Sequence, residues 1–423
     1  MRYGTTLLFL AACSRASPDP GLISVPAPTP AASAASATTS LAPPAASSVA
    51  ASSAAPAPAP SPSLVLVGGD LVDLGSMSVA RTLTTDMVFA HAIAGATAYL
   101  WARGDLRAYD AVSGALRWSK PIADCWVMAA SNDGALCGGN TGVIFFRKAD
   151  GSSSKAGAGT GVAALVGVGG KFVAVYGDKR VEAFDAAGTL AGATTAPVVP
   201  DRGYAHVALE VGGALACGVQ RSDASSTVFC LDATPRVVWS KTSVPGGALT
   251  QVDGDVVVVA SDTWAKAPSS DVLRTSDGAP LLHVSGVRLA AALTTGGALD
   301  GALATDPITL FDATGAAKWT APATSIFHGA LRAVRAGPNL AIAQFSPIAT
   351  GTQLFALDAA TGALAWRASV DSLPISHSKY SNEVTLRDAN KTLLLLGHES
   401  SQDYAQTFDP ATGRRLGSVV RGR

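Results

Sequence analysis

The chain has 423 residues, 31 acidic and 31 basic, so its formal net charge is zero. This balance provides no positive surface for nucleic acid or for an anionic membrane, and we expect no nucleic-acid partner. Ala, Gly, Val, Ser and Thr dominate the composition, which suits strands and turns better than helices. The length allows several average domains or one large repeat domain.

The N-terminus predicts export. Arg2 precedes an apolar run over residues 5–12 that is too short to span a bilayer, which needs about 20 residues. The run ends in Leu10-Ala11-Ala12-Cys13, which resembles the lipobox of bacterial lipoproteins, in which the signal is cut before a cysteine that receives lipid. We therefore expect a signal peptide over residues 1–12 and a lipid on Cys13. The alternative is an ordinary signal peptide with a coincidental cysteine.

The next segment predicts a tether. Residues 21–63 contain no charged and no aromatic residue, and residues 18–62 hold 11 of the 24 prolines. Such a segment cannot bury enough apolar surface to fold. We expect residues 13–63 to be a disordered Ala/Pro/Ser-rich tether, which at about 3.1 Å per residue reaches up to roughly 130 Å.

The remaining residues, 64–423, contain a repeat whose mark is a turn glycine followed four residues later by tryptophan. Full copies pair Gly114 with Trp118, Gly315 with Trp319, and Gly362 with Trp366. A variant pairs Pro235 with Trp239. Weaker copies, in which another residue replaces the tryptophan, have their turn glycines at Gly151, Gly188, Gly278 and Gly413.

Each copy also contains an earlier apolar hairpin, such as "AALVGVGGKFVAVYG" at residues 163–177. One unit is therefore four antiparallel strands in 40–50 residues, which is typical of a β-propeller blade. We expect an all-β fold with eight blades over residues 64–423. Seven blades with one irregular copy is the alternative, and residues 64–87 are candidates for a strand that closes the ring.

The repeated residues have structural roles in this interpretation. Glycine supplies the positive φ that the turn between the third and fourth strands needs. An aspartate before it accepts backbone N–H groups within the turn, and the tryptophan packs between adjacent blades. The aspartates at this position are Asp110, Asp185, Asp232, Asp312, Asp358 and Asp409, whereas Arg147 and Arg274 replace the aspartate in two copies.

The repeat resembles the pyrroloquinoline-quinone-like propellers, a group that includes quinoprotein dehydrogenases and the non-catalytic outer-membrane assembly lipoprotein of the BamB type. In those proteins an Asp-x-x-Thr-Gly-x-x-x-Trp pattern docks the blades. The pattern stands here from Asp358 through Gly362 to Trp366, and nearly so from Asp110 to Trp118. The resemblance spans roughly residues 64–423 and indicates the fold without fixing the function.

Features of the enzymes in that group are absent from the sequence. It contains no Cys-Cys pair, and residues 64–423 leave little room for the long insertions that build the quinone site. No P-loop, no dinucleotide fingerprint after a strand, and no GxSxG motif in residues 64–423 is present. We therefore expect no catalytic residues, no cofactor and no metal.

The cysteines and histidines are the remaining candidates. Cys217 and Cys230 flank a predicted hairpin centred on residues 223–224, which places them opposite each other and favours a disulfide in an exported protein. Cys125 and Cys137 are out of simple register, so both a second disulfide and reduced buried thiols stay open. The histidines on or beside first strands, where they are expected to line the channel rim without metal, are His91, His206 and His328.

The sequence as a whole predicts a lipid-anchored, non-catalytic propeller that binds envelope proteins at the outer membrane, facing the periplasm or the cell surface. The alternative is a propeller enzyme or small-ligand sensor that uses the mouth of the central channel. The longest loops are the expected contact surfaces, at residues 261–271, 345–353 and 371–383.

Overall fold

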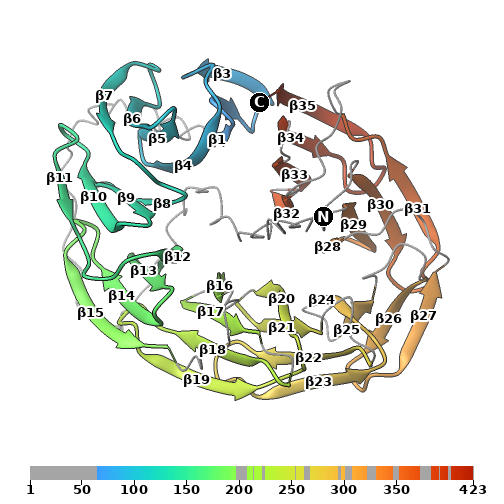
Figure 1. Cartoon of the computed structure of the whole chain (residues 1–423). Coiled ribbons are helices and arrows are strands. Elements are labelled where there is room, and N and C mark those ends of the chain that lie inside the picture. Colours follow the sequence, from blue (N-terminus) through green and yellow to red (C-terminus); the bar gives the residue numbers. More distant parts are fainter. Residues whose placement is uncertain are drawn as a thin grey trace, which may run out of the picture.

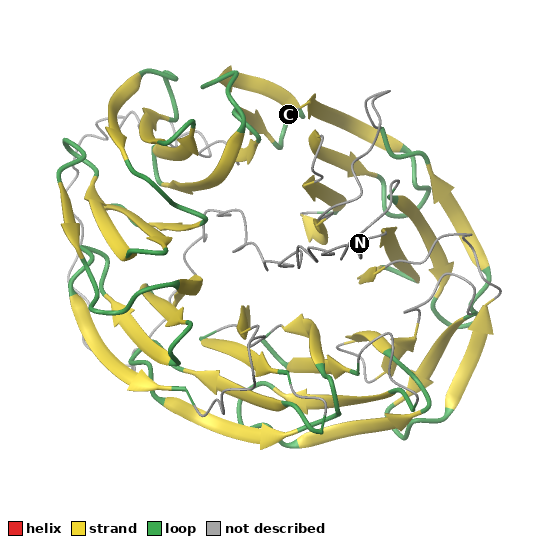
Figure 2. Cartoon of the chain, viewed as in Figure 1, coloured by secondary structure: helices red, strands yellow, loops and turns green. Residues whose placement is uncertain are grey.

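The structure is a computed structural model that describes residues 64–196, 207–212, 214–221, 224–252, 254–261, 267–293, 297–300, 307–321, 330–345, 352–371, 383–389, 391–398 and 402–422. Every regular element in these ranges is a β-strand (Figure 2). None of the described segments is a helix long and apolar enough to cross a bilayer. The predicted signal peptide and tether lie outside the described residues.

The strands form antiparallel sheets arranged as blades around a common axis, which confirms the predicted β-propeller (Figure 1). Eight sheets have four strands and one has three, so the ring has nine blades. The predicted counts of eight and of seven are therefore wrong. We number the blades I to IX in chain order, and in blades II to IX the first strand is innermost (Figure 1).

Blade I consists of β1 (Leu64–Val67), β2 (Asp70–Asp73) and β3 (Ser78–Thr82). Blade II consists of β4 (Val88–Ala94), β5 (Thr97–Ala102), β6 (Asp105–Asp110) and β7 (Leu116–Pro121). Blade III consists of β8 (Val127–Ala130), β9 (Gly134–Gly139), β10 (Gly142–Arg147) and β11 (Ser153–Lys155). Blade IV consists of β12 (Val162–Val168), β13 (Lys171–Tyr176), β14 (Arg180–Phe184) and β15 (Leu190–Thr195).

Blades V to VII consist of β16 (Val207–Gly212), β17 (Leu215–Gln220), β18 (Thr227–Leu231), β19 (Val237–Thr242); β20 (Ala248–Val252), β21 (Val256–Ala260), β22 (Ser269–Arg274), β23 (Pro280–Ser285); and β24 (Leu289–Leu293), β25 (Gly297–Asp300), β26 (Ile308–Asp312), β27 (Ala317–Ala321). Blades VIII and IX consist of β28 (Ala330–Ala336), β29 (Asn339–Phe345), β30 (Gln353–Asp358), β31 (Leu364–Ala368); and β32 (Glu383–Ala389), β33 (Thr392–His398), β34 (Gln402–Phe408), β35 (Arg415–Gly422).

The hydrophobic core lies between neighbouring blades. The second strands are covered on both faces, which explains the unbroken apolar run "VVVVA" of β21, all of it buried. One buried cluster joins Val175 of blade IV to Phe229 of blade V, and both side chains are fully buried. A single blade exposes two apolar faces, so each blade is stable only when both of its neighbours cover it.

The aspartate turn joins the third and fourth strands of a blade. In blade II the carboxylate of Asp110 accepts the backbone N–H groups of Val112 (3.0 Å) and Ser113 (2.8 Å), and Gly114 takes a φ of +76°. These hydrogen bonds, led by the Ser113 N–H, lower the pKa of Asp110 to about 2. Where arginine replaces this aspartate, Asp150 and Asp277 accept the turn N–H groups instead.

The tryptophan that follows the turn contacts the next blade. In blade VII the indole of Trp319 lies on Gly362 of blade VIII, where an added Cβ would be 2.6 Å from the ring. The indole N–H of Trp319 donates to the carbonyl of Ala359 at 3.1 Å. The same arrangement joins Trp118 to Gly151, Trp239 to Gly278, and Trp366 to Gly413.

Replacing one of these indoles will destabilise the ring. Trp366 is 8% exposed, and Trp366→Ala is expected to cost about 3–5 kcal/mol because it leaves a cavity at the seam. Leu364→Ala on the same strand is the matched control, because Leu364 is 53% exposed and its loss should change stability by less than about 0.5 kcal/mol. Denaturant midpoints measure both, and equal effects of the two substitutions would contradict the docking role.

The sequence did not predict blade I, because its copy of the repeat lacks both the turn glycine and the tryptophan. Asp73 accepts the N–H of Gly75 at 2.8 Å, as an aspartate of the repeat does, but Met77 holds the turn position with a φ of +47°. Arg81 stands where the tryptophan is expected. Residues 64–87 therefore do not contribute a single closing strand. Residues 64–82 form the three strands of blade I.

All nine seams follow one rule. We name the place of the turn glycine in each blade the turn position, and the place of the tryptophan, four residues later, the docking position. At each seam one blade contributes glycine and its neighbour a larger group. Arg81 faces Gly114 and Leu282 faces Gly315, in place of tryptophan. Gly188 faces Phe145 of β10 rather than the docking residue Lys155.

Two seams reverse the pair. Gly192 holds the docking position of blade IV and faces Pro235, which replaces the turn glycine of blade V. Gly417 holds the docking position of blade IX and faces Met77 of blade I, where an added Cβ would overlap the methionine. The larger side chain then comes from the turn rather than from the outer strand.

The seam between blades IX and I closes the ring, as Figure 1 shows where β35 meets β3. Besides the reversed pair of Met77 and Gly417, Arg421 of β35 forms an ion pair with Asp70 of β2. Arg421 also donates to the carbonyl of Thr84. Asp70 is 7% exposed, so this pair is largely removed from water, and removing one partner leaves a buried charge.

The reversed seam predicts a rescue experiment. Gly417→Leu should lower the thermal midpoint by roughly 1–4 °C, because its side chain collides with Met77. Adding Met77→Gly should restore most of the loss, since it removes the collision and supplies a residue suited to a positive φ. Additive losses in the double variant would show that the two positions are independent.

Candidate functional site

The structure describes one of the three histidines that are expected to line the channel rim. His91 lies on β4 and is half-buried, whereas His206 and His328 lie outside the described residues. Among the described side chains, no three His, Cys, Asp or Glu residues gather in a way that could hold a metal ion. The described part of the rim therefore gives no geometry on which to build a metal site.

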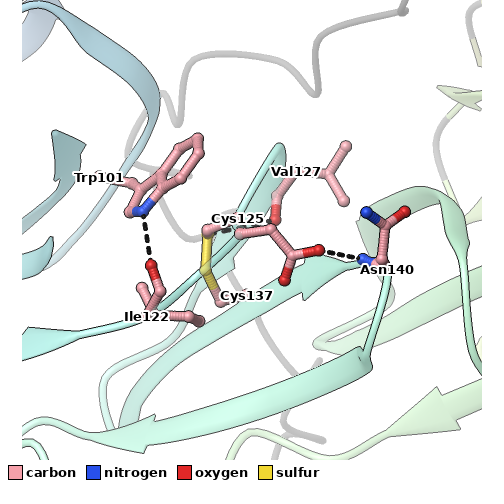
Figure 3. The surroundings of a disulfide bond; sticks show 7 residues. Trp101, Ile122, Cys125, Val127, Cys137 and Asn140 are labelled. Carbon is pink, nitrogen blue, oxygen red and sulfur yellow. Dashed lines mark hydrogen bonds between the residues drawn. A yellow bond between two sulfur atoms is a disulfide. The ribbon is translucent and has the colours of Figure 1, made fainter. Parts of the chain in front are cut away.

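Both cysteine pairs are joined. Cys217 and Cys230 face each other across β17 and β18, with Cα atoms 4.0 Å apart, as the predicted hairpin requires. Cys125, just before β8, is bonded to Cys137 of β9, the pair that the sequence left open (Figure 3). All four sulfur-bearing residues are buried, so these disulfides staple blades III and V from within.

One hydrogen-bonded chain has the order of a hydrolytic triad. Nδ1 of His283 lies 2.7 Å from Asp271, and Nε2 lies 3.1 Å from the hydroxyl of Ser285. All three residues are on the two outer strands of blade VI, where Asp271 pairs directly with His283. The sequence did not reveal this hydrogen-bonded group of three side chains, because its residues are not part of a nucleophile-elbow motif.

The surroundings of that chain do not support acyl transfer. The N–H that follows a nucleophilic serine commonly stabilises the oxyanion. Here the N–H of Gly286 donates to the carbonyl of Pro268 at 2.7 Å. His283 is 56% exposed, so water reaches the imidazole freely. The arrangement is thus a surface hydrogen-bond network on the two outer strands of blade VI.

Strand direction gives the ring two different faces. First strands begin, and second strands end, on the face that we name the loop face. The aspartate turns lie on the opposite, turn face. The described strands that precede the longest predicted loops, at residues 261–271, 345–353 and 371–383, are second or fourth strands, and such strands end on the loop face. Most residues of these loops lie outside the described part of the chain.

An aromatic cluster lies on the loop face of blades II and III. It consists of Phe89 of β4, Trp101 of β5 and Trp126, which directly precedes β8. The ring centroids of Phe89 and Trp101 are 5.3 Å apart, and those of Trp101 and Trp126 are 6.4 Å apart with the rings edge to face. Phe89 is 53% exposed, and neighbouring Met87 is 43% exposed.

The cluster is positioned by rigid elements. Phe89 sits in a β-bulge between Val88 and Ala90, which turns its side chain out of the regular strand alternation. The indole N–H of Trp101 points at the carbonyl of Ile122 at 3.4 Å, next to the disulfide of blade III (Figure 3). Because strands and a disulfide hold these rings, their exposed surface is largely preorganised.

The fold itself does not require these aromatic residues. The first strand of blade IV has a β-bulge at the equivalent position, between Val162 and Ala164. The bulged residue there is Ala163, which is exposed. Gly138 and Val175 occupy the position of Trp101 in blades III and IV. Three aromatic rings gathered where the repeat accepts small residues indicate a contact surface.

Charged groups border the cluster. Asp86, one residue before Met87, pairs with Arg103 at 2.8 Å and with Arg107 at 2.8 Å. The hydrogen bond from Arg107 lowers the pKa of the Asp86 carboxyl. Arg103 is 76% exposed, so the apolar rings have a polar, solvated border, as protein contact surfaces do.

Sequence reasoning did not find the cluster, although a signal was present. Phe89, Trp126 and Ala163 recur at the interval that separates Gly114, Gly151 and Gly188. An alignment of the repeats at the start of the first strand therefore shows aromatic residues in two copies and alanine in the third. Trp101 lies on another strand, and only the folded blade brings it between the other two.

Comparison with known proteins gives one family match. Residues 304–421, which include the two outer strands of blade VII, all of blade VIII and nearly all of blade IX, match the family described as outer membrane protein assembly factor BamB. No curated protein matches the chain.

Solved structures are similar to this chain at low sequence identity. BamB from Moraxella catarrhalis is 15% identical, with 80% of this chain and 92% of that chain covered and a TM-score of 0.45. The computationally designed Ika8 protein is also 15% identical, with 78% and 97% covered and a TM-score of 0.49. A eukaryotic initiation factor is 10% identical, with 84% and 94% covered and a TM-score of 0.54, a likeness that shows the fold alone.

The family match falls on the blades that carry the most complete docking pattern, from Asp358 to Trp366. The predicted resemblance of this chain to the pyrroloquinoline-quinone-like, BamB-type β-propellers is confirmed.

Proposed function

We propose that the protein is a non-catalytic propeller that is anchored by a lipid on Cys13 in the outer membrane and holds partner proteins of the bacterial envelope on its loop face. The observation that carries the proposal is the family match over residues 304–421. The two buried disulfides agree with an oxidising compartment. The sequence Leu10-Ala11-Ala12-Cys13 supports the anchor.

The aromatic cluster is the proposed partner contact. Rigid, partly exposed aromatic rings provide large contact area with little loss of side-chain entropy on binding. The solvated pair of Asp86 and Arg103 at its border supplies polar contacts. A partner that packs an apolar side chain against the exposed ring of Phe89 fits this surface.

A non-catalytic function is proposed because the described residue groups do not assemble a reaction site. The chain of Asp271, His283 and Ser285 comes nearest, but the N–H of Gly286 is already bonded to Pro268. Thermal shift measurements with calcium and pyrroloquinoline quinone test the enzyme alternative. A rise of several degrees would favour a ligand site in the ring.

If Cys13 carries the lipid anchor, replacing this cysteine should release the protein from the outer membrane. The wild-type protein should sediment with outer membranes and incorporate labelled palmitate. Cys13→Ala should do neither, because a single thiol carries the lipid. Equal sedimentation of the two proteins would contradict the anchor, while a folded ring in both would exclude misfolding as the cause.

The contact surface predicts site-selective crosslinking. A photoreactive amino acid at Phe89 should give adducts with a specific envelope protein at about five times the yield of one at Val112. Val112 is the matched control, since it is 68% exposed in the aspartate turn of the same blade, on the turn face.

A companion variant separates binding from stability. Phe89→Ala should leave the thermal midpoint within about 1 °C, because the side chain is largely exposed. With the photoreactive amino acid placed at Met87, the Phe89→Ala protein should give fewer adducts with the envelope protein than the protein that keeps Phe89. Equal yields from Phe89 and Val112, or undiminished adducts from Phe89→Ala, would show that partners bind elsewhere.

A further inference from the structure

The exposed hydrophobic side chains gather on two parts of the surface. Among the described residues, ten large hydrophobic side chains are exposed, and Met87 and Phe89 of these belong to the loop face. The other eight lie in or just after the turns that lead into the outermost strands, on the turn face. They are Val79, Val112, Leu116, Leu190, Val238, Leu281, Leu364 and Leu416. Single exposed hydrophobic residues are normal, but a set confined to one face indicates a contact surface.

Seven of these eight side chains recur at the start of an outermost strand. Two residues after the turn position stand Val79, Leu116, Leu190 and Leu364, and three residues after it stand Val238, Leu281 and Leu416. Their strands form the circumference of the ring in Figure 1. Because the blades share one axis, equivalent positions lie at similar heights along it. The seven side chains therefore circle the edge of the turn face, and we name them the turn-face belt.

The fold itself does not require this belt. In blade III the two equivalent positions hold Ser153 and Ser154, and in blade VII they hold Ala317 and Lys318. Polar and small residues thus begin an outermost strand as well as leucine does. Hydrophobic residues at these positions in seven of the nine blades indicate contact with an apolar partner.

The charges beside the belt are paired. Arg117 forms an ion pair with Asp110 of the aspartate turn in blade II. In blade V, Arg236 forms the same kind of pair with Asp232 at 3.1 Å. Neighbouring charges of opposite sign offset each other, so this surface has little attraction for an anionic headgroup. Its contact with a partner is therefore apolar rather than electrostatic.

The circular arrangement fits a flat partner better than a compact one. A surface of planar shape can meet side chains at similar height on all sides of the ring at once. An ordinary protein interface covers about 800 Å² of each partner and would meet only a few neighbouring blades. The belt also consists of separate aliphatic side chains, whereas the core of a protein contact surface is rich in grouped aromatic residues.

The described chain begins on the same face. Leu64 of β1 pairs with Asp73, where the aspartate turn of blade I starts. The ring is therefore joined on its turn face to the part of the chain that contains Cys13. A lipid on Cys13 would raise the effective concentration of the belt at the bilayer, so that even a weak apolar contact is populated.

We propose that the turn-face belt contacts the phospholipid bilayer to which the anchor holds the protein, with its aliphatic side chains between the headgroups and the acyl chains. The loop face and its aromatic cluster then point away from the bilayer, toward partner proteins. The proposal deepens the function proposed above and rests on it for the presence of the membrane.

Photocrosslinking to lipid tests the contact with the full, lipidated chain in phosphatidylcholine vesicles. A photoreactive amino acid at Leu364 should give at least about five times more lipid adducts than one at Phe89. Phe89 is the matched control, because both side chains are 53% exposed and they lie on opposite faces. Equal yields would show that the tether holds the ring in solution, and they would overturn the proposal.

A double substitution removes the apolar contact without removing the anchor. Leu116→Glu with Leu364→Glu should leave the thermal midpoint within about 2 °C, because both side chains are exposed. Lipid adducts from a photoreactive amino acid at Leu190 should decrease at least about threefold. Met87→Glu with Phe89→Glu makes the same change on the loop face and should leave those adducts unchanged. Equal effects of the two double variants would contradict the proposed contact.

Lipid composition tests the apolar character of the contact. Vesicles that contain equal parts of phosphatidylcholine and phosphatidylglycerol should give the same adduct yield from Leu364 as phosphatidylcholine alone, at low and at high salt. A yield that requires phosphatidylglycerol would show electrostatic binding and would contradict the role of the belt.

The anchor and the belt can fail separately. If the wild-type protein incorporates palmitate but Leu364 and Phe89 give equal lipid adducts, the belt proposal is wrong and the anchor stands. If no palmitate is incorporated, Cys13 can be coupled to a maleimide phospholipid, because the other four cysteines form disulfides. The comparison of Leu364 with Phe89 then still decides the contact. A dimer in sedimentation velocity that the two glutamates of the belt dissociate, without lipid adducts, would assign this face to a second copy of the chain instead.

Discussion

The contact between a glycine and a larger side chain at each seam is the interaction on which the ring depends. Each blade has two apolar faces, and neither face is stable in water until a neighbour covers it. Trp319 on Gly362 shows the geometry, in which the missing Cβ lets an indole lie against the backbone and donate to the carbonyl of Ala359. The requirement is for one small partner in each pair, which is why Met77 and Gly417 satisfy it in reverse.

This constraint explains how much the sequence could predict. The turn glycines and tryptophans appear in the sequence as a repeat, so the all-β class, the four-stranded unit and the propeller followed from residues such as Asp358, Gly362 and Trp366. Blade I did not, because a methionine at the turn and an arginine at the docking position remove the pattern while the three-dimensional contact is kept. A motif search detects residue types, whereas the seam selects complementary volumes.

The aromatic cluster was hidden for a different reason. Phe89 and Trp126 occupy equivalent positions in neighbouring blades, but their meaning appears only when Trp101, from an adjacent strand, is placed between them. Surface chemistry on a repeat protein is built across units, and it consists of departures from the repeat rather than of the repeat itself. The same holds for Asp271, His283 and Ser285, which strand pairing alone brings into line.

The closing seam has a consequence for how the molecule is made. Arg421 meets the carbonyl of Thr84 across 337 positions of sequence. A contact of such separation forms late, since most of the chain must be ordered before its loop entropy is repaid. Until then β35 and blade I are both uncovered, and each offers the surface that the other needs. Two unfinished rings that meet in a crowded compartment have matching ends, so exchange of a terminal blade between molecules is the characteristic error to which this architecture is exposed.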